Sequence, residues 1–151
     1  MPHVKTTVDI AASPAQVWAI LSDLSAYPAW NPLIVGARGW LDDGAPLDLE
    51  VAVGRTTTLL GTRVLRVRPG EELRWHGPRS SLLRRLLCGE HYFVLESLAS
   101  GCRLVHGEIF SGLASGLVPS AAYGRLGRAY DSMNQALKRR AESELAQPTS
   151  A

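Results

Sequence analysis

The segment RLVHGEIF, residues 103–110, combines an imidazole and a carboxylate with large apolar side chains. In a β-strand, alternate residues point to the same face, which here would carry Leu104, His106, Glu108 and Phe110. Histidine and glutamate side chains can both give and take protons. A carboxylate on an apolar face is costly unless it is paired or hydrogen-bonded. This face is therefore either a core with an internal hydrogen-bond cluster or the polar wall of a ligand cavity.

The preceding segment EHYFVLESL, residues 90–98, is expected to pair with RLVHGEIF in a hairpin whose turn is Ser100-Gly101. This register sets Phe93 opposite Glu108, and directly opposed residues share a face. A four-residue loop keeps the same faces, whereas a three-residue loop exchanges them. We predict an even-numbered turn, because it gathers the large apolar side chains together. The shared face then holds His91, Phe93, Leu95, Leu104, His106, Glu108 and Phe110.

The two cysteines, Cys88 and Cys102, fall at opposite ends of that hairpin. About ten residues of strand, at ~3.3 Å each, separate them, whereas the Cα atoms of a disulfide lie within about 7 Å of each other. We expect two free thiols, as in a reducing cytoplasm.

The 151 residues suit a single domain, with 46% hydrophobic and 20% charged residues. The net charge of +2 is too small to indicate nucleic-acid binding. The chain lacks an apolar run of the length, about 18 residues, that spans a membrane, and it lacks a charged-then-apolar leader. We therefore expect a soluble cytoplasmic protein without an integral membrane segment.

Hydrophobic periodicity predicts the elements that must position the hairpin. A strand over 3–10 is followed by a helix with a capping box, formed by Ser13 and Gln16, and a proline at its first position. A short second helix should end near Tyr27, because the residue before Pro28 resists the helical conformation. Further strands are predicted over 33–41, 47–53, 56–67 and 73–77, before the hairpin strands 90–98 and 102–110.

After Gly116 the apolar residues change to helical spacing. The stripe of a long C-terminal helix consists of Tyr123, Leu126, Tyr130, Met133, Leu137 and Ala141. An antiparallel sheet commonly buries one face, and this helix is the obvious cover. The predicted class is α+β, with about seven strands.

This order of elements, with DLSAYPAWNPLI after the first helix and GEHYFVLE and RLVHGEIFSGL before the last, resembles the START-like (SRPBCC) superfamily. Within it, the chain looks like the bacterial polyketide cyclase/dehydrase-type group. The resemblance spans nearly the whole chain, and we expect one START-like domain over residues 1–146; the polar segment QPTSA, residues 147–151, is expected to be a flexible tail. The resemblance also implies the helix-grip fold, a curved antiparallel sheet wrapped around the C-terminal helix with a ligand cavity between them. Members bind lipids, sterols, polyketides, plant hormones or quinones, and some catalyse cyclisation or dehydration.

Two functions are consistent with this resemblance. The first is binding of a small hydrophobic or amphipathic molecule, lipid-like or polyketide-like, in an internal cavity. The alternative is a polyketide cyclase or dehydratase in which Glu108, His106 and His91 transfer protons. The group offers no invariant triad to carry over, so catalysis stays open, as does the choice between monomer and homodimer.

Other candidate contacts have structural alternatives. Trp30 and Asn31 would form either a pocket rim or a packing motif that fixes the short helix. Trp75 would touch a ligand or fill space, and Tyr123 and Tyr130 would floor the cavity or belong to the core. The predicted ligand-binding set is Trp30, Asn31, Trp75, His91, Phe93, His106, Glu108, Phe110, Tyr123 and Tyr130.

The segment SLLRRLLC, residues 81–88, is interpreted as a mobile gate, a basic amphipathic patch for a membrane or partner, or a solvated loop. Sequence signatures of other chemistries are missing: the chain has no glycine-rich phosphate loop, no HExxH, no Cys-x-x-Cys and no GxSxG. We therefore expect neither a cofactor nor a metal.

Overall fold

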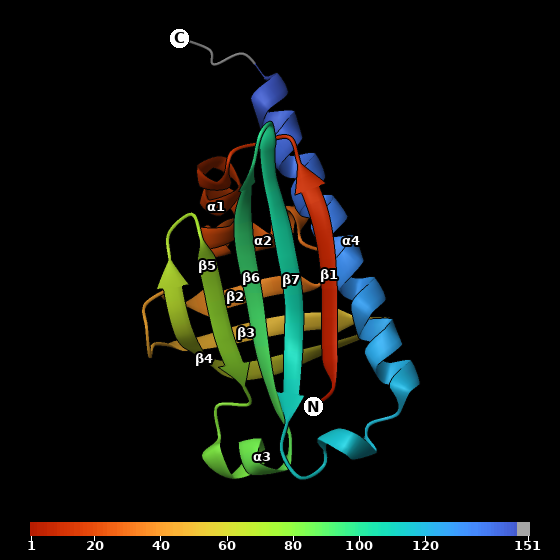
Figure 1. Ribbon diagram of the computed structural model, residues 1–151. Coiled ribbons are helices and arrows are strands. Elements are labelled where there is room, and N and C mark those ends of the chain that lie inside the picture. The colour runs from red at the N-terminus through yellow and green to blue at the C-terminus, as the bar shows by residue number, and fades with distance from the viewer. Residues whose placement is uncertain (148–151) are drawn as a thin grey trace.

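The computed structural model describes residues 1–147, and the predicted tail lies outside this range apart from Gln147. The described residues form seven strands and four α-helices (Figure 1), and all of them except helix α3 follow the order that the periodicity predicted. The bounds are β1 His3–Ile10, α1 Pro14–Ser22, α2 Tyr27–Trp30, β2 Ile34–Gly39, β3 Pro46–Val53, β4 Thr56–Arg68, β5 Glu72–Gly77, α3 Ser81–Leu86, β6 Cys88–Leu98, β7 Gly101–Ser111 and α4 Ser120–Ala146. Two short 3-10 turns, η1 Leu24–Ala26 and η2 Ser115–Leu117, complete the order.

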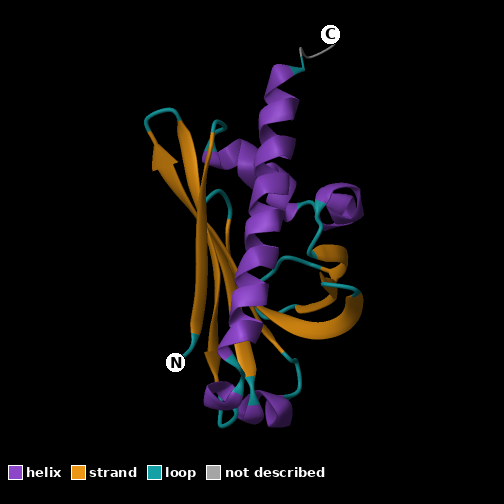
Figure 2. Cartoon of the chain, turned by 90° about the vertical axis from the view of Figure 1, so that its right-hand side faces the viewer, coloured by secondary structure: helices purple, strands orange, loops and turns teal. Residues whose placement is uncertain are grey.

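All seven strands form one antiparallel sheet in the order β1-β7-β6-β5-β4-β3-β2. Within residues 1–147, the β1–β7 pair joins distant parts of the sequence, and the other neighbouring strands are consecutive along the chain. The sheet curves so that strands lie on both sides of α4 (Figure 2). This is the predicted α+β helix-grip arrangement.

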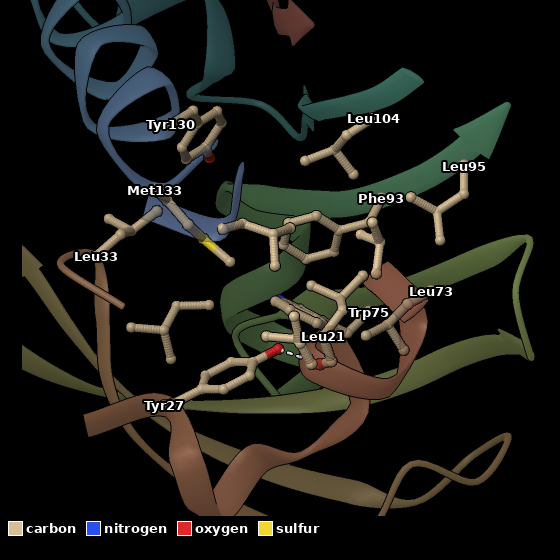
Figure 3. Packing of buried hydrophobic residues seen from close by; sticks show 14 of the residues in the cluster. Leu21, Tyr27, Leu33, Leu73, Trp75, Phe93, Leu95, Leu104, Tyr130 and Met133 are labelled. Carbon is tan, nitrogen blue, oxygen red and sulfur yellow. Dashed lines mark hydrogen bonds between the residues drawn. The ribbon is translucent and has the colours of Figure 1, made fainter. Parts of the chain in front are cut away.

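The apolar stripe of α4 faces the sheet, as its spacing predicted. Tyr130, Met133 and Leu137 are at most 1% exposed, and they meet the inner residues of the central strands. Figure 3 shows Tyr130 and Met133 pointing from α4 toward Phe93 and Trp75. The core therefore lies between α4 and the concave face of the sheet.

The first helix has the predicted capping box, in which Ser13 Oγ accepts from Gln16 N and Gln16 Oε1 accepts from Ser13 N. The end predicted for the second helix was wrong. Helix α2 begins at Tyr27 and contains Pro28 within its first turn. Proline fits there because the first helical N–H groups have no partner inside the helix.

The hairpin turn consists of Ala99 and Ser100, one residue earlier than predicted. The register therefore pairs Phe93 with His106, and the predicted pairing with Glu108 was wrong. Gly101 belongs to the strand, at φ +139°, where a Cβ would overlap the backbone oxygen of Ile10. The turn still has two residues, so the predicted sharing of a face is confirmed.

Both cysteines are free thiols at opposite ends of the hairpin, as predicted. None of the helices within residues 1–147 combines the length and apolar character needed to cross a membrane.

Candidate functional site

A small enclosed pocket lies between the sheet and α4, with a volume of about 60 Å³. Its walls are mostly apolar, and four polar or aromatic side chains converge on one side: Trp75, His91, Glu108 and Tyr130. The remaining lining comes from Leu33, Ile34, Leu49, Val51, Leu60, Thr62, Gly77 and Gly89. A water occupies about 30 Å³ of liquid, so the pocket has room for about two waters.

Strand register places the three sheet residues of this polar side in one row. Trp75 on β5 lies opposite His91 on β6, which lies opposite Glu108 on β7. The rings of Trp75 and His91 stack, with centroids 4.8 Å apart and planes 3° from parallel. His91 Nδ1 lies 3.8 Å from Glu108 Oε2. The stacked indole therefore holds the imidazole with one nitrogen turned toward the carboxylate.

Glu108 is held from the opposite side by α4. The Tyr130 hydroxyl donates a hydrogen bond to Glu108 Oε2. Burial, and then the negative charge of Glu108, raise the pKa of the Tyr130 phenol well above its ordinary value. Gly89 leaves the space that the carboxylate occupies, because a Cβ there would overlap Glu108 Oε1. Tyr130 is thus a hydrogen-bond donor at the pocket and keeps its proton at neutral pH.

His106 lies behind His91, away from the pocket. Its side chain is fully buried, and its ring stacks on Tyr130 with centroids 4.3 Å apart. Burial, and then the neighbouring His91, lower the pKa of His106 well below its ordinary value of 6.5. His106 is therefore neutral at physiological pH, with one protonated ring nitrogen and one lone pair.

A chain of hydrogen bonds fixes which nitrogen carries that proton. Thr6 Oγ1 donates to the backbone carbonyl of His106 at 3.1 Å, so it accepts from Asn134 Nδ2 at 2.8 Å. Asn134 Oδ1 then accepts from His106 Nδ1 at 2.7 Å. The lone pair of His106 Nε2 must therefore accept from His91 Nε2 at 2.9 Å.

The direction of the hydrogen bond between His91 and His106 determines which nitrogen of His91 is available to the pocket. Its Nε2 proton is used in the bond to His106, so Nδ1 is the nitrogen left for exchange with Glu108 or a ligand. His106 has both nitrogens engaged inside the core. In this arrangement His106 is a positioning residue, and of the three residues predicted to transfer protons, His91 and Glu108 line the pocket.

The predicted contacts divide into three groups. Trp75, His91, Glu108 and Tyr130 line the pocket. Phe93 and His106 pack directly behind them, with ring centroids 4.4 Å apart.

The other four predicted contacts lie elsewhere. Trp30 packs edge-on against Tyr27 and lies outside the pocket lining, and Asn31 accepts from two backbone N–H groups of the following turn. Phe110 packs on Tyr123, whose hydroxyl donates to the Ser115 carbonyl.

Two features were missed by the sequence reasoning. Asn134 lies four residues after Tyr130 on the buried face of α4, and a polar residue on an apolar stripe was the available signal. An open cleft of about 600 Å³ adjoins the pocket, and Leu33 lines both spaces. Arg125, Arg128 and Ser132 of α4 form one wall of the cleft, and residues 32–33 and 52–54 form the other. Side chains from such distant segments leave no local signature.

Among residues 1–147, the structure has no group of three His, Cys, Asp or Glu side chains placed to hold a metal ion.

Residues 1–142 match the profile of a family described as polyketide cyclase/dehydrase and lipid transport. The chain belongs to this family. A comparison with curated protein sequences found no match. Among solved structures, the chain is similar to the Zhui aromatase/cyclase from Streptomyces sp. R1128, with 20% identity, a TM-score of 0.74 and 95% of each chain covered.

A START superfamily protein from Mycobacterium smegmatis is also similar, at 22% identity and a TM-score of 0.72, covering 93% of this chain and 97% of the other. At these identities the likeness establishes the fold. The similar structures thereby confirm the predicted START-like fold, and the family match confirms the predicted resemblance to the polyketide cyclase/dehydrase group.

Proposed function

We propose that the protein binds a small amphipathic molecule whose polar end carries a hydroxyl or carbonyl oxygen. The observation that carries this proposal is the polar row of His91, Glu108 and Tyr130 on one side of an otherwise apolar pocket. Burying these polar groups in a core would be costly unless something hydrogen-bonds to them. A hydroxyl group of the ligand would donate to His91 Nδ1 or to Glu108, and a carbonyl oxygen of the ligand would accept from the Tyr130 hydroxyl.

The volumes indicate how such a ligand would lie. A pocket for a drug-sized molecule typically measures about 300–1,000 Å³, whereas the inner pocket measures about 60 Å³ and the adjoining cleft about 600 Å³. The inner pocket suits the polar end, and the cleft suits the apolar body. Leu33, which lines both, would have to change rotamer to join them.

Binding can be measured by titrating the protein with the fluorescent probe 1-naphthol. Leu33→Trp should weaken binding, because the larger side chain blocks the connection between the inner pocket and the cleft. Glu108→Gln should weaken binding because it removes the carboxylate that would accept a hydrogen bond from the hydroxyl group of the probe. Leu59→Trp, on an exposed part of β4, is the matched control. Equal affinities for all four proteins would refute the site, and circular dichroism would verify that each variant is folded.

An enzymatic function is a second candidate, and the fixed polarity of the histidine pair favours it. With Nε2 protonated, the lone pair of His91 Nδ1 can take a proton from the carbon next to a carbonyl group. The proton that His91 has taken can then pass to a β-hydroxyl group, directly or through the Glu108 carboxylate, and the hydroxyl group leaves as water while the carbon–carbon double bond forms. The balance is one C–H and one C–O bond broken, one C=C bond formed and one water released.

This dehydration can be followed by absorbance with a β-hydroxy-β-phenyl ketone, whose product is a conjugated enone. His91→Gln and Glu108→Gln should each abolish turnover while probe binding falls less. Turnover that survives both substitutions would refute the catalytic assignment and leave the binding proposal to its own test. We also propose a cytoplasmic location, supported by the two free thiols.

A further inference from the structure

Five exposed leucines gather at one end of the molecule. Leu82, Leu83 and Leu86 lie on α3, and Leu113 and Leu117 lie on the loop after β7, with exposed fractions between 50% and 85%. We call these five residues the leucine tip. Figure 1 shows α3 and the short helix after β7 projecting together beyond the ends of β6 and β7.

The two segments of the leucine tip are fixed to each other by their backbones. Leu113 N donates to the Arg85 carbonyl at 3.0 Å, and Ala114 N donates to the Leu86 carbonyl at 2.8 Å. Gly112 permits this approach, because it has φ +102° and a Cβ would lie 2.6 Å from the Leu86 oxygen. The leucines therefore form one organised apolar surface.

The two segments that carry the leucine tip contain positive charges only. Residues 78–89 and 111–130 contain five arginines and neither aspartate nor glutamate. Arg79 pairs with Asp48, and Arg84 donates to the backbone carbonyls of Pro78 and Arg79. Arg85, between the leucines of α3, has no ion pair within residues 1–147.

We propose that the leucine tip docks the protein onto an anionic lipid bilayer. Leucines beside arginines, on a projecting end, match a surface that inserts shallowly while basic groups meet lipid phosphates. The alternative occupants, a second copy of this chain or another protein, would meet a surface whose uncompensated charge is all positive. Anionic headgroups complement that charge directly.

The leucine tip also adjoins the pocket through the chain itself. The segment that carries α3 is bracketed by Gly77 and Gly89, and both glycines line the inner pocket. Docking would therefore bring the pocket close to the bilayer surface. The docking proposal rests on the leucines and arginines alone, and it stands whether or not the pocket binds a ligand.

Vesicle flotation tests the proposal with two lipid compositions, phosphatidylcholine alone and phosphatidylcholine mixed with phosphatidylglycerol. The full chain should float with the mixed vesicles and bind them less at high salt. Leu113→Ser should weaken partitioning by at least about tenfold, because one buried leucine side chain is worth that factor. Leu59→Ser, on exposed β4, is the matched control and should bind as the unmodified chain does.

Arg85→Glu distinguishes the electrostatic contribution to vesicle binding from that of the inserted leucines. It should weaken binding only to the mixed vesicles. Failure of the unmodified chain to float, or equal flotation of Leu113→Ser, would overturn the proposal. A dimer in solution that Leu113→Ser dissociates, without vesicle binding, would overturn it in favour of a protein interface. Naphthol affinity measured without lipid should be unchanged by Leu113→Ser, which keeps this test independent of the pocket.

Discussion

The fully buried imidazole of His106 should make the stability of the protein fall in mild acid. In the folded state its pKa lies well below 6.5, whereas the unfolded chain binds a proton at the ordinary value. Below pH 6.5 the unfolded state therefore holds more protons on this residue, so the free energy of unfolding decreases as the pH falls. One proton taken up over the interval from 6.5 to about pH 5 corresponds to a loss of ~2 kcal/mol.

Replacing His106 with asparagine removes this dependence and lowers the stability at neutral pH. The asparagine amide can still donate to Asn134 Oδ1, but the N–H of His91 loses its acceptor. An unsatisfied buried donor costs about 1–3 kcal/mol. At about pH 8 the variant should therefore be less stable than the unmodified protein. The difference between their free energies of unfolding should become ~2 kcal/mol smaller by about pH 5.

Urea unfolding followed by tryptophan fluorescence at several pH values measures both curves. Ile10→Val is the matched control, because it removes a buried methylene, costs about 0.5–1.5 kcal/mol and adds or removes no titrating group. Its curve should run parallel to that of the unmodified protein. Parallel curves for His106→Asn as well would show that the imidazole is already charged in the fold, and the deduced polarity of the histidine pair would then be wrong.

Three further predictions concern the pocket and the first helix. Tyr130→Phe removes the donor to the partly buried Glu108 and should lower the free energy of unfolding by about 1.5–3 kcal/mol; an unchanged urea midpoint would contradict the hydrogen bond. Gly89→Ala should displace the Glu108 carboxylate from the Tyr130 hydroxyl. The variant that combines Gly89→Ala with Tyr130→Phe should therefore lose less free energy of unfolding than the two single variants together. Strict additivity would show that the two positions are independent. Ser13→Ala should cost about 1 kcal/mol by thermal or urea unfolding through loss of the helix cap, and a shift within experimental error would show that the cap contributes nothing.

The inner face of the hairpin was predictable, whereas its pairing was not. Alternation fixes which side chains share a face, and any two-residue turn preserves this parity. The position of the turn depends on Gly101 and its close approach to Ile10, a contact with the edge strand β1. Register therefore depended on a distant segment that short-range patterns do not report.

In the candidate site, too, the face of a strand was predictable from the sequence, whereas the long-range contacts were not. His91 and Glu108 were predictable because polar residues at inward positions of a strand are unusual. The polarity of the histidine pair depends on Thr6 and Asn134, which come from β1 and α4. Helix α2 was mispredicted for a local reason. Pro28 was interpreted as the end of a helix, whereas it lies in the first turn of α2.

The placement of β1 has a consequence for the order in which the chain can fold. Its partner β7 begins about ninety residues later, and Ala11, just after β1, donates to Glu142 near the end of α4. Strand β1 therefore gains these contacts only after nearly all of the other described elements have been synthesised. Such long-range closure is slow compared with local hairpin formation. The hairpins from β2 to β7 are expected to form first, with β1 and α4 completing the domain last.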